Sequence, residues 1–319
     1  MSNLEERLLL LLPKGVVGVL ALVGILAVGR ILACSVWGVV GALRTYVWAR
    51  LWAKSLPETY GKWAVVTGST DGIGKSYAKE LAKKGMNILL VSRNMEKLQR
   101  VAKEIRSKYR VQTDVVQADF ALGRPIYGNI AKRLKGKDIG ILVNNVGMLL
   151  APGPFKKLTE DNIWAYVNVN VASVLAMTRL VLPEMLRRKK GAVVNVSSVA
   201  SYFPMAYFQV YSASKAFVSS FSRALREECG SSGAAVQCVE PGAVSTNMTS
   251  FDKDIHTPGF FTPTADAFAG SAVATLGHAA RTTGYWAHRL QLAVWRTLPE
   301  RYIVSSYKAR MDNKLKKSK

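Results

Sequence analysis

The sequence predicts an α/β fold, a doubly wound parallel sheet of about seven strands with a hydrophobic membrane segment at its N-terminus. Three observations predict it. Short β-branched runs alternate with helical patterns from residue 62 onward, a glycine-rich loop follows the first run, and an apolar stretch precedes residue 44. No internal repeat or low-complexity linker interrupts the alternation. We expect a membrane-anchoring segment over 1–55, one α/β domain over 56–290 and a basic tail over 291–319.

The apolar stretch is the first element of the chain. Apolar residues and glycines run without interruption over 15–29 and nearly so over 31–43, with Arg30 between them. Fifteen residues rise about 22 Å as a helix, short of a bilayer core of about 30 Å, but the combined stretch is long enough to span. Arg30 could snorkel to one face, mark a tilted or re-entrant helix, or separate two interfacial segments. A buried soluble helix is the alternative to membrane attachment, which we expect.

The flanks of this stretch predict its orientation. A cleaved signal peptide fits poorly, because Glu5 and Glu6 precede the apolar residues. Arg44, Arg50 and Lys54 follow them, and positive flanks stay on the cytosolic side. The remainder of the chain is therefore expected in the cytosol.

The C-terminus contains a candidate targeting signal. The chain ends KLKKSK, with Lys316 and Lys317 at the fourth and third positions from the end. This spacing matches the dilysine retrieval pattern of endoplasmic reticulum membrane proteins, although a solvated basic tail is the alternative. We predict an endoplasmic reticulum membrane protein whose α/β domain faces the cytosol.

Charge and cysteine content limit the partners. The 319-residue chain carries a formal charge of +23, densest over 281–319, which suits anionic lipid headgroups, a phosphorylated cofactor or an acidic substrate. We expect no nucleic acid partner, since no RNA-binding motif, zinc finger or basic heptad run is present. Cys34, Cys229 and Cys238 form no C-x-x-C pair and the histidines lack metal-ligand spacing, so we expect no metal and a reducing compartment.

The α/β domain has a regular order of elements. The β-branched runs predict buried strands, and the helical patterns end at glycine or polar stops. Strands are expected over 62–68, 87–94, 112–120, 138–147, 191–198 and 234–242. Helices are expected over 73–85, 95–109, about 160–188 and 210–225. Such alternation implies right-handed crossovers and a parallel sheet covered on both faces.

The glycine-rich loop lies between the first strand and the first helix. The loop TGSTDGIG spans 67–74, and its glycines allow a tight turn in front of a helix N-terminus that can receive a diphosphate. The spacing is G-x-x-x-G-x-G, and its place at the start of the alternation predicts a Rossmann-type dinucleotide site. The expected cofactor contacts are Gly68, Ser69, Thr70, Asp71, Gly72, Ile73 and Gly74.

Two further residues bear on the cofactor. Arg93 ends the second strand, where NAD enzymes usually place an acid, and an arginine there suits the 2′-phosphate of NADP(H). A solvated strand-end arginine is the alternative. Asp119, after the third strand, could meet the adenine, or it could cap a helix or loop.

The stretch VYSASKAFVSSFSRAL (210–225) holds a phenol and an ammonium one helical turn apart. Tyr211 and Lys215 could be an ordinary surface pair, or an acid with the cation that tunes it. The apolar AFV after Lys215 predicts the packing face of the helix.

Several motifs now coincide: TGxxxGIG at 67–74, NNVG at 144–147, a serine ending the fifth strand, YxxxK at 211–215 and a PG pair with a later threonine. Together they resemble the short-chain dehydrogenase/reductase family over about residues 60–290. YGKWAVVTGSTDGIGKSYAKELAKKG, IGILVNNVGM, VLPEM and YSASKAFV are similar to its membrane branch, the very-long-chain 3-oxoacyl-CoA reductases and related 17β-hydroxysteroid dehydrogenases.

The resemblance implies roles for individual residues. It implies a catalytic group of Asn170, Ser198, Tyr211 and Lys215, with Asn168 a less favoured candidate than Asn170. In it, Tyr211 is the proton donor, Ser198 binds the carbonyl oxygen, Asn170 orders a water, and Lys215 lowers the pKa of Tyr211 and holds the nicotinamide ribose. Further cofactor contacts are implied at Asn145, Gly147, Tyr211, Lys215, Pro241, Gly242 and Thr246.

The implied function is an NADPH-dependent ketoreductase that reduces 3-oxoacyl-CoA to 3-hydroxyacyl-CoA in very-long-chain fatty acid elongation. A keto-steroid substrate and a catalytically weak cofactor-binding scaffold are the alternatives, and PGAVST after the sixth strand departs from the acyl-CoA reductases. Elongation partners and a homodimer stay open. Residues 250–263 predict a substrate loop, and 284–304 a lipid-facing surface, a lid, a dimer contact or a packed helix.

Overall fold

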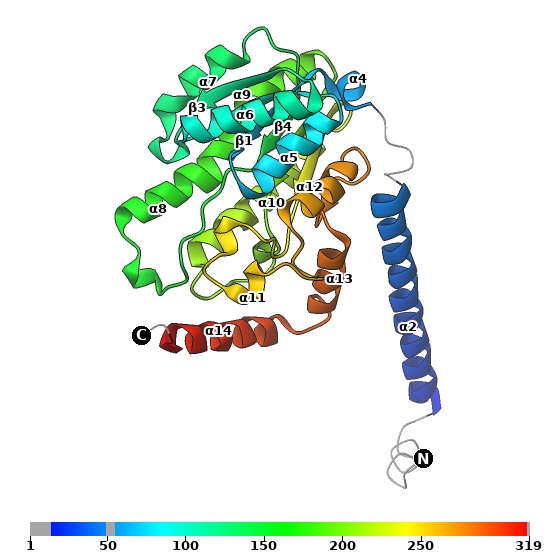
Figure 1. Ribbon diagram of the computed structural model, residues 1–319. Helices are drawn as coiled ribbons and strands as arrows, with labels where there is room; N and C mark the ends of the chain where they lie inside the picture. The colour runs from blue at the N-terminus through cyan, green and yellow to red at the C-terminus, as the bar shows by residue number, and fades with distance from the viewer. Residues whose placement is uncertain (1–13, 49–54, 318–319) are drawn as a thin grey trace.

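The computed structural model describes residues 14–48 and 55–317. Glu5, Glu6, Arg50 and Lys54 lie outside the described residues. The chain forms a parallel seven-stranded sheet in the order β3-β2-β1-β4-β5-β6-β7 (Figure 1). The strands are β1 (Trp63–Thr67), β2 (Asn87–Ser92), β3 (Thr113–Gln117), β4 (Ile139–Asn144), β5 (Gly191–Val196), β6 (Ala234–Val239) and β7 (Arg281–Thr282). The predicted fold class is confirmed.

The strand order reverses beside β1. Val65 of β1 pairs in register with Leu89 of β2 on one side and with Leu142 of β4 on the other. Ligands of open α/β sheets bind in the crevice at the carboxyl ends of the strands where the order reverses. The glycine-rich loop follows β1 directly and therefore lies at this crevice.

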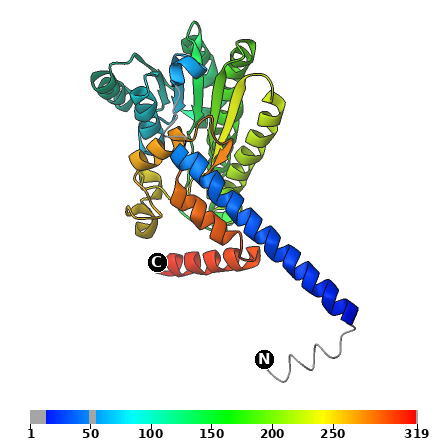
Figure 2. The ribbon, with the colours of Figure 1, turned by 90° about the vertical axis from the view of Figure 1, so that its right-hand side faces the viewer.

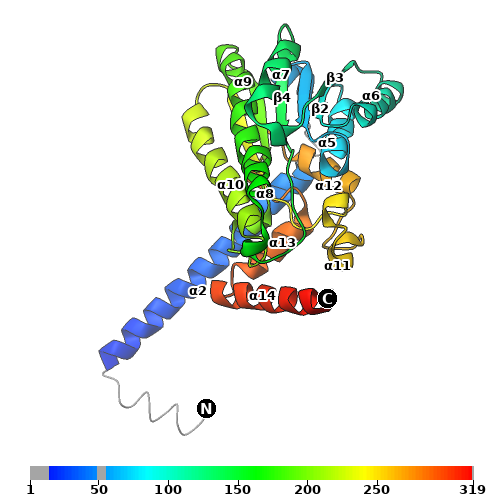
Figure 3. The same cartoon turned by 90° about the vertical axis from the view of Figure 1, so that its left-hand side faces the viewer.

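Helices cover both faces of the sheet (Figure 3). Alternate side chains of each strand point to opposite faces, so Val66 joins the core under one layer and Val65 the core under the other. One layer contains α5 (Gly72–Lys83), α6 (Met95–Tyr109) and α12 (Ala265–Ala274). The other contains α7 (Tyr127–Leu134), α9 (Ser173–Arg187) and α10 (Gln209–Cys229).

The long helix predicted over about 160–188 is interrupted. It consists of α8 (Glu160–Tyr166), a π-helical segment η5 (Val167–Ala172) and α9. A π-helical segment inside an α-helix frequently marks a functional position, and this one carries Asn168 and Asn170. Over the described residues, the run from 160 to 187 is also long and apolar enough to cross a membrane, but half of its apolar 18-residue window is buried inside the domain. It is a core element.

The N-terminal apolar stretch is one continuous helix. Helix α2 (Lys14–Leu43) has 30 residues, followed by the π-helical η1 (Arg44–Trp48). Its length is about 45 Å at the usual rise. Arg30 is exposed within the unbroken helix, so it does not separate two helical segments. Figure 2 shows α2 leaving the domain, and its exposed side chains include Val19, Ile25 and Leu26.

The C-terminal part holds elements that the sequence predicted only in part: a packed helix was one of the alternatives for 284–304, and that range contains a helix. Strand β7 has two residues, and α13 (Trp286–Trp295) and α14 (Glu300–Lys317) follow it, so most of the predicted tail is helical. Helices α7 and α12 were also not expected. Residues 250–263 include α11 (Lys253–His256). The short elements are α4 (Leu56–Tyr60), η2 (Phe120–Leu122), η3 (Arg124–Ile126), η4 (Phe155–Lys157), η6 (Val199–Ser201) and η7 (Asn247–Thr249). The domain boundaries stay predictions.

Candidate active site

The glycine-rich loop is shaped by positions that only glycine fits. Gly68 (φ +64°) and Gly72 (φ +50°) adopt the left-handed conformation. A Cβ added at Gly74 would clash with the carbonyl oxygen of Gly68 and the side-chain nitrogen of Asn145. The start of α5 therefore approaches the end of β1 so closely that the turn has no room for a side chain.

Hydrogen bonds fasten the loop to β2. The Ser69 hydroxyl is buried and donates to the Val91 carbonyl (3.4 Å), and the Thr70 and Ser92 hydroxyls lie 2.9 Å apart. Asp71 caps α5, accepting from the Gly72 amide at 2.8 Å. Ile73 packs against the core. These side chains hold the loop, and the Gly68 and Gly72 amides are already bonded, so the remaining backbone amides of the loop are the groups left for a phosphate.

Arg93 and Asp119 lie beyond the ends of adjacent strands, β2 and β3. The Arg93 side chain is exposed, while its carbonyl accepts from Gln117 Nε2 at 3.0 Å. Asp119 caps η2, accepting from the Ala121 amide at 3.0 Å. The cap predicted as an alternative for Asp119 is present, and a contact with adenine stays a prediction.

Tyr211 and Lys215 lie in the first two turns of α10. The Lys215 side chain is only 5% exposed; its Nζ donates to the Val196 carbonyl (2.9 Å) and lies 5.8 Å from the centre of the Tyr211 ring. Burial lowers the pKa of Lys215 to about 8. Burial also raises the pKa of Tyr211, and an interaction with Ser198 offsets part of that rise. The pair is therefore not an ordinary solvated surface pair.

Ser198 adjoins this pair at the end of β5. It caps η6, and its Oγ accepts from the Ala200 amide at 3.1 Å. Because that bond uses only a lone pair, the hydroxyl hydrogen can still be donated to a ligand.

The packing face of α10 predicted after Lys215 is wrong at Phe217, which is 39% exposed and stacks on Phe221. Val218, in contrast, is buried.

Asn170 reaches the same place from η5. Its Oδ1 accepts from the Met148 amide (2.8 Å), and its Nδ2 donates to the Met148 carbonyl (3.1 Å) and to Ser214 Oγ (3.0 Å). A Cβ added at Gly147 would lie 3.4 Å from Lys215 Nζ and 3.7 Å from Asn170 Oδ1. Asn168 instead donates to the Ala121 carbonyl. The structure thus brings Asn170 and Lys215 together around Gly147, without Asn168.

The segment after β4 closes one side of the crevice. Asn145 Nδ2 donates to the carbonyls of Thr67 (3.0 Å) and Gly68 (3.3 Å), and the Asn145 amide donates to the Thr67 hydroxyl. Asn145 therefore fixes the glycine-rich loop from the neighbouring strand.

The segment after β6 closes the other side. The Pro241 carbonyl accepts from the Val199 amide (2.9 Å), and the Gly242 amide donates to His288 Nδ1 (3.1 Å). Burial lowers the pKa of His288, so a neutral ring accepts at Nδ1 and donates from Nε2 to a carbonyl. Thr246 caps η7, and a Cβ at Gly72 would lie 3.1 Å from its methyl group. The loop after β6 therefore contacts the glycine-rich loop.

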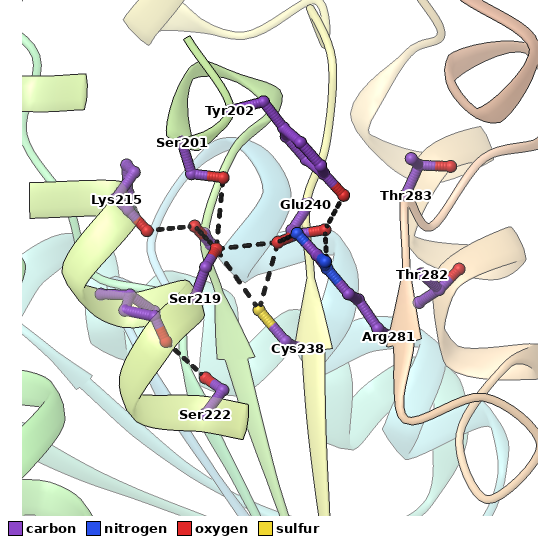
Figure 4. A network of polar contacts seen from close by, with 12 residues as sticks. Ser201, Tyr202, Lys215, Ser219, Ser222, Cys238, Glu240, Arg281, Thr282 and Thr283 are labelled. Atoms are coloured by element: carbon purple, nitrogen blue, oxygen red, sulfur yellow. Dashed lines mark hydrogen bonds and ion pairs between the residues drawn. The ribbon is translucent and has the colours of Figure 1, made fainter. Parts of the chain in front are cut away.

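Sequence reasoning missed a buried network behind the site (Figure 4). Glu240 is 1% exposed and accepts from Arg281 Nε (2.8 Å) and Nη2 (2.9 Å), from the Tyr202 hydroxyl (2.7 Å) and from Ser219 Oγ (2.8 Å). Ser197 Oγ lies 2.8 Å from Ser219 Oγ and donates to the Lys215 carbonyl. The signal was an acid directly after an apolar strand, in CVEPG.

A second buried network also escaped prediction. Asn144 Nδ2 donates to Asn195 Oδ1 (2.8 Å) and to the Thr178 hydroxyl (3.1 Å), and Asn195 Nδ2 donates to Ser222 Oγ (2.9 Å). It joins β4 and β5 to α9 and α10. Asparagines inside otherwise apolar strands were the available signal, because a buried amide needs partners.

The structure has a pocket that lies away from the predicted site. This pocket, lined by Leu134, Asp138, Glu184 and Arg188, among others, contains none of the predicted site residues. Within residues 14–48 and 55–317, no group of three His, Cys, Asp or Glu side chains is placed to hold a metal ion. Cys229 and Cys238 are free and buried.

The fold and the site define a dinucleotide-binding α/β protein of the dehydrogenase type. A family model described as short chain dehydrogenase matches residues 62–255. The chain belongs to this family, whose members are oxidoreductases, and the predicted resemblance is confirmed.

Relatives at similar identity carry different names. The chain is 46% identical over 283 residues to the Homo sapiens inactive hydroxysteroid dehydrogenase-like protein 1, covering 88% of this chain and 86% of that one. It is 44% identical over 276 residues to the Anas platyrhynchos very-long-chain 3-oxoacyl-CoA reductase, covering 86% and 84%. A solved short-chain dehydrogenase from Sphingobium yanoikuyae in complex with NADPH matches with a TM-score of 0.64 and 30% identity, covering 70% and 87%.

Proposed function

We propose that the protein is an NADPH-dependent ketoreductase of the endoplasmic reticulum membrane that reduces 3-oxoacyl-CoA to 3-hydroxyacyl-CoA. One observation carries the activity: Tyr211, Ser198, Lys215 and Asn170 come from three separate elements and converge beside the glycine-rich loop. A protein without turnover would have no need of a buried lysine next to a half-buried tyrosine, since burial opposes the charged state of the lysine.

The loop fits a dinucleotide phosphate. Its glycines leave the first turn of α5 open to close approach, and Asn145 holds the loop in shape. The exposed Arg93 beyond β2 suits a 2′-phosphate, which favours NADPH over NADH. The NADPH bound to the solved relative is consistent with this choice. Gly147, Pro241, Gly242 and Thr246 would line the nicotinamide side.

The chemistry assigns each side chain one task. When bound, NADPH would supply the hydride for the carbonyl carbon. Tyr211 donates its phenolic proton to the carbonyl oxygen, whose developing charge Ser198 also stabilises by a hydrogen bond. Lys215, charged below its pKa of about 8, stabilises the tyrosinate that results. Asn170 holds the Met148 backbone and Ser214. In the proposed mechanism it would also order a water that links Lys215 to solvent.

The names of two relatives and the basic surface of the protein bear on the choice of substrate. The duck relative is named a very-long-chain 3-oxoacyl-CoA reductase, and the basic surface suits a CoA phosphate. A keto-steroid is the second candidate, because the human relative is named hydroxysteroid dehydrogenase-like. That name also contains "inactive", which favours a scaffold with little turnover as the third. We expect partners in an elongation complex only if the substrate is a 3-oxoacyl-CoA.

The membrane location rests on α2 and on the chain ends. Exposed apolar side chains of α2 would be poorly solvated in water, and Lys316 and Lys317 provide the retrieval pattern. The basic residues that follow the apolar stretch in the sequence would keep the domain on the cytosolic side. Fractionation of cells that express a tagged full chain, with protease protection of the tag, tests both statements.

One assay tests the activity and separates the substrates. Purified membranes containing the full chain should oxidise NADPH with a long-chain 3-oxoacyl-CoA and less with a 17-ketosteroid. Tyr211→Phe should abolish reduction while NADPH binding stays nearly intact, because only the phenolic hydroxyl is lost and the ring and the other expected cofactor contacts remain. Activity with neither substrate would favour the scaffold, and full turnover by Tyr211→Phe would contradict the proton-donor role.

A second variant tests the cofactor. Arg93→Asp should shift the preference from NADPH toward NADH, since a carboxylate repels the 2′-phosphate and can bind a ribose hydroxyl. Lys97→Asp, one turn into α6, is a control for the loss of positive charge. An unchanged preference in Arg93→Asp would mean that another residue recognises the phosphate.

A further inference from the structure

Helix α13 presents an apolar face to the outside of the domain. Every exposed residue of the helix is apolar: Trp286, Leu290, Ala293 and Val294. These positions are spaced i, i+4, i+7 and i+8 and lie on one face. Trp286, Leu290 and Val294 are 46%, 50% and 54% exposed. An ordinary packed helix with a basic outer face would show the reverse pattern.

A neighbouring loop extends this face. Phe260 is 57% exposed and meets Trp286 edge to face, with ring centres 5.0 Å apart. Phe261, 42% exposed, lies 4.8 Å from Phe260 by the same measure. We call Phe260, Phe261, Trp286, Leu290 and Val294 the apolar ridge. Contiguous exposed apolar patches of this kind mark interaction sites.

The apolar ridge lies where α2 joins the domain. The Tyr46 hydroxyl in η1 lies 3.1 Å from the hydroxyls of Thr282 and Thr283, just before α13. A Cβ at Gly41 of α2 would lie 3.2 Å from Arg289 Nη2 of α13. Figures 2 and 3 show α13 beside α2 before the N-terminal part of α2 projects away from the domain. A bilayer around that projecting part would be adjacent to α13.

Basic and aromatic residues border the apolar ridge. Arg296 and Arg301 are exposed just beyond α13, and Tyr302 is 61% exposed at the start of α14. Tryptophan and tyrosine favour the headgroup level of a bilayer, and arginines favour anionic headgroups. A second copy of the chain would bring the same arginines face to face, and like charges oppose that contact.

We propose that the apolar ridge is a second membrane contact, which enters the headgroup–acyl boundary and fixes the orientation of the domain on the bilayer. The proposal rests on membrane attachment through α2. On the opposite side of α13, His288 binds Gly242 and the carbonyls of Ala243 and Phe261. The contact therefore places the loop after β6, and the site that it borders, next to the lipid phase.

Spin labels measure the contact in the full chain. Leu290→Cys and Val294→Cys would be labelled in a Cys34→Ser background, in nanodiscs of phosphatidylcholine and phosphatidylserine. Leu26→Cys on α2 is the lipid control, and Lys103→Cys on the exposed side of α6 is the solvent control. The measurement is the collision rate of each label with oxygen, which is enriched in lipid, and with a water-soluble nickel chelate, which is excluded from lipid. We expect labels 290 and 294 about 5–10 Å below the phosphate level.

Each result decides the proposal. Labels at 290 and 294 that favour oxygen and exclude nickel, as at Leu26, support it. Nickel access as high as at Lys103 overturns it, and so does low access of both reagents, which would indicate cover by protein, such as a second copy. If label 26 meets lipid while 290 and 294 meet water, only this proposal fails. If label 26 also meets water, membrane attachment fails with it.

Discussion

Replacing Glu240 by glutamine tests the network behind the site. The buried carboxylate receives four hydrogen bonds from O–H and N–H donors and a weaker one from the Cys238 thiol, and a glutamine amide in its place could accept only part of them because its NH₂ end faces donors. Arg281 would lose its partner, but its side chain is 39% exposed and can be hydrated, whereas Glu240 is 1% exposed. The loss should therefore lie at the low end for a buried ion pair.

The magnitude follows from this asymmetry. We expect Glu240→Gln to lower the free energy of unfolding by about 3 kcal/mol, and Arg281→Met, which leaves the buried carboxylate without its cation, by about 4–5 kcal/mol. A loss of about 3 kcal/mol corresponds to a fall of roughly 6–12 °C in Tm for a domain of this size. The double variant should lose less than the sum of the two, because neither charge is left unpaired.

The assay is thermal unfolding of the full chain followed by near-UV circular dichroism, together with steady-state reduction at a permissive temperature. Because Ser219 and Ser197 connect Glu240 to the Lys215 carbonyl, kcat of Glu240→Gln should fall about tenfold. A larger destabilisation by Glu240→Gln than by Arg281→Met would refute the reasoning. A coupling energy below about 0.5 kcal/mol would refute it too.

Two further predictions concern the site. In the cofactor-free protein, Lys215→Met should raise the free energy of unfolding at pH 7 by about 2 kcal/mol, because a lysine whose pKa falls from 10.5 to about 8 opposes folding by about 3 kcal/mol and the lost Val196 bond returns about 1. The gain should vanish as the pH rises from about 8 to 10.5, where the folded lysine is already neutral; a pH-independent gain in denaturant titrations would contradict it. Gly74→Ala should abolish NADPH binding in a fluorescence titration, since its Cβ has no space, while Gly128→Ala in α7, with nothing within 4 Å, should bind normally.

The sheet was predictable because its strands are short buried runs. All of β4 and β5 is buried. Short, continuous apolar runs of this kind are typical of strands in a parallel sheet covered on both faces. Helix α6 (Met95–Tyr109) matches its predicted bounds, because Asn94 caps its start and a polar face marks its length. The sheet was predicted to have about seven strands, but the position of β7 was not predicted, since two residues give no periodicity and its pairing with β6 depends on the folded sheet.

The site was partly predictable for a similar reason. Gly68, Gly72 and Gly74 are required by local backbone geometry, which a sequence records directly. Lys215 and Tyr211 share one helix, so their spacing predicts their proximity. Residues that act across elements left no such signal: nothing in CVEPG indicates that Glu240 meets an arginine 41 positions later.

The substrate side depends most on long-range contacts, which is why its specificity was the hardest part to predict. Tyr207 has φ +66°, an unfavourable conformation for tyrosine, and its hydroxyl donates to Asp312 of α14. On the same helix, Arg310 and Lys314 pair with Asp252, which is 5% exposed. Helix α14 thereby connects the loop after β6 to the segment just before Tyr211. We infer that a substrate long enough to extend past Tyr211 would meet this helix, and that the choice between an acyl chain and a steroid would then depend on a part of the chain that lies outside the family motifs.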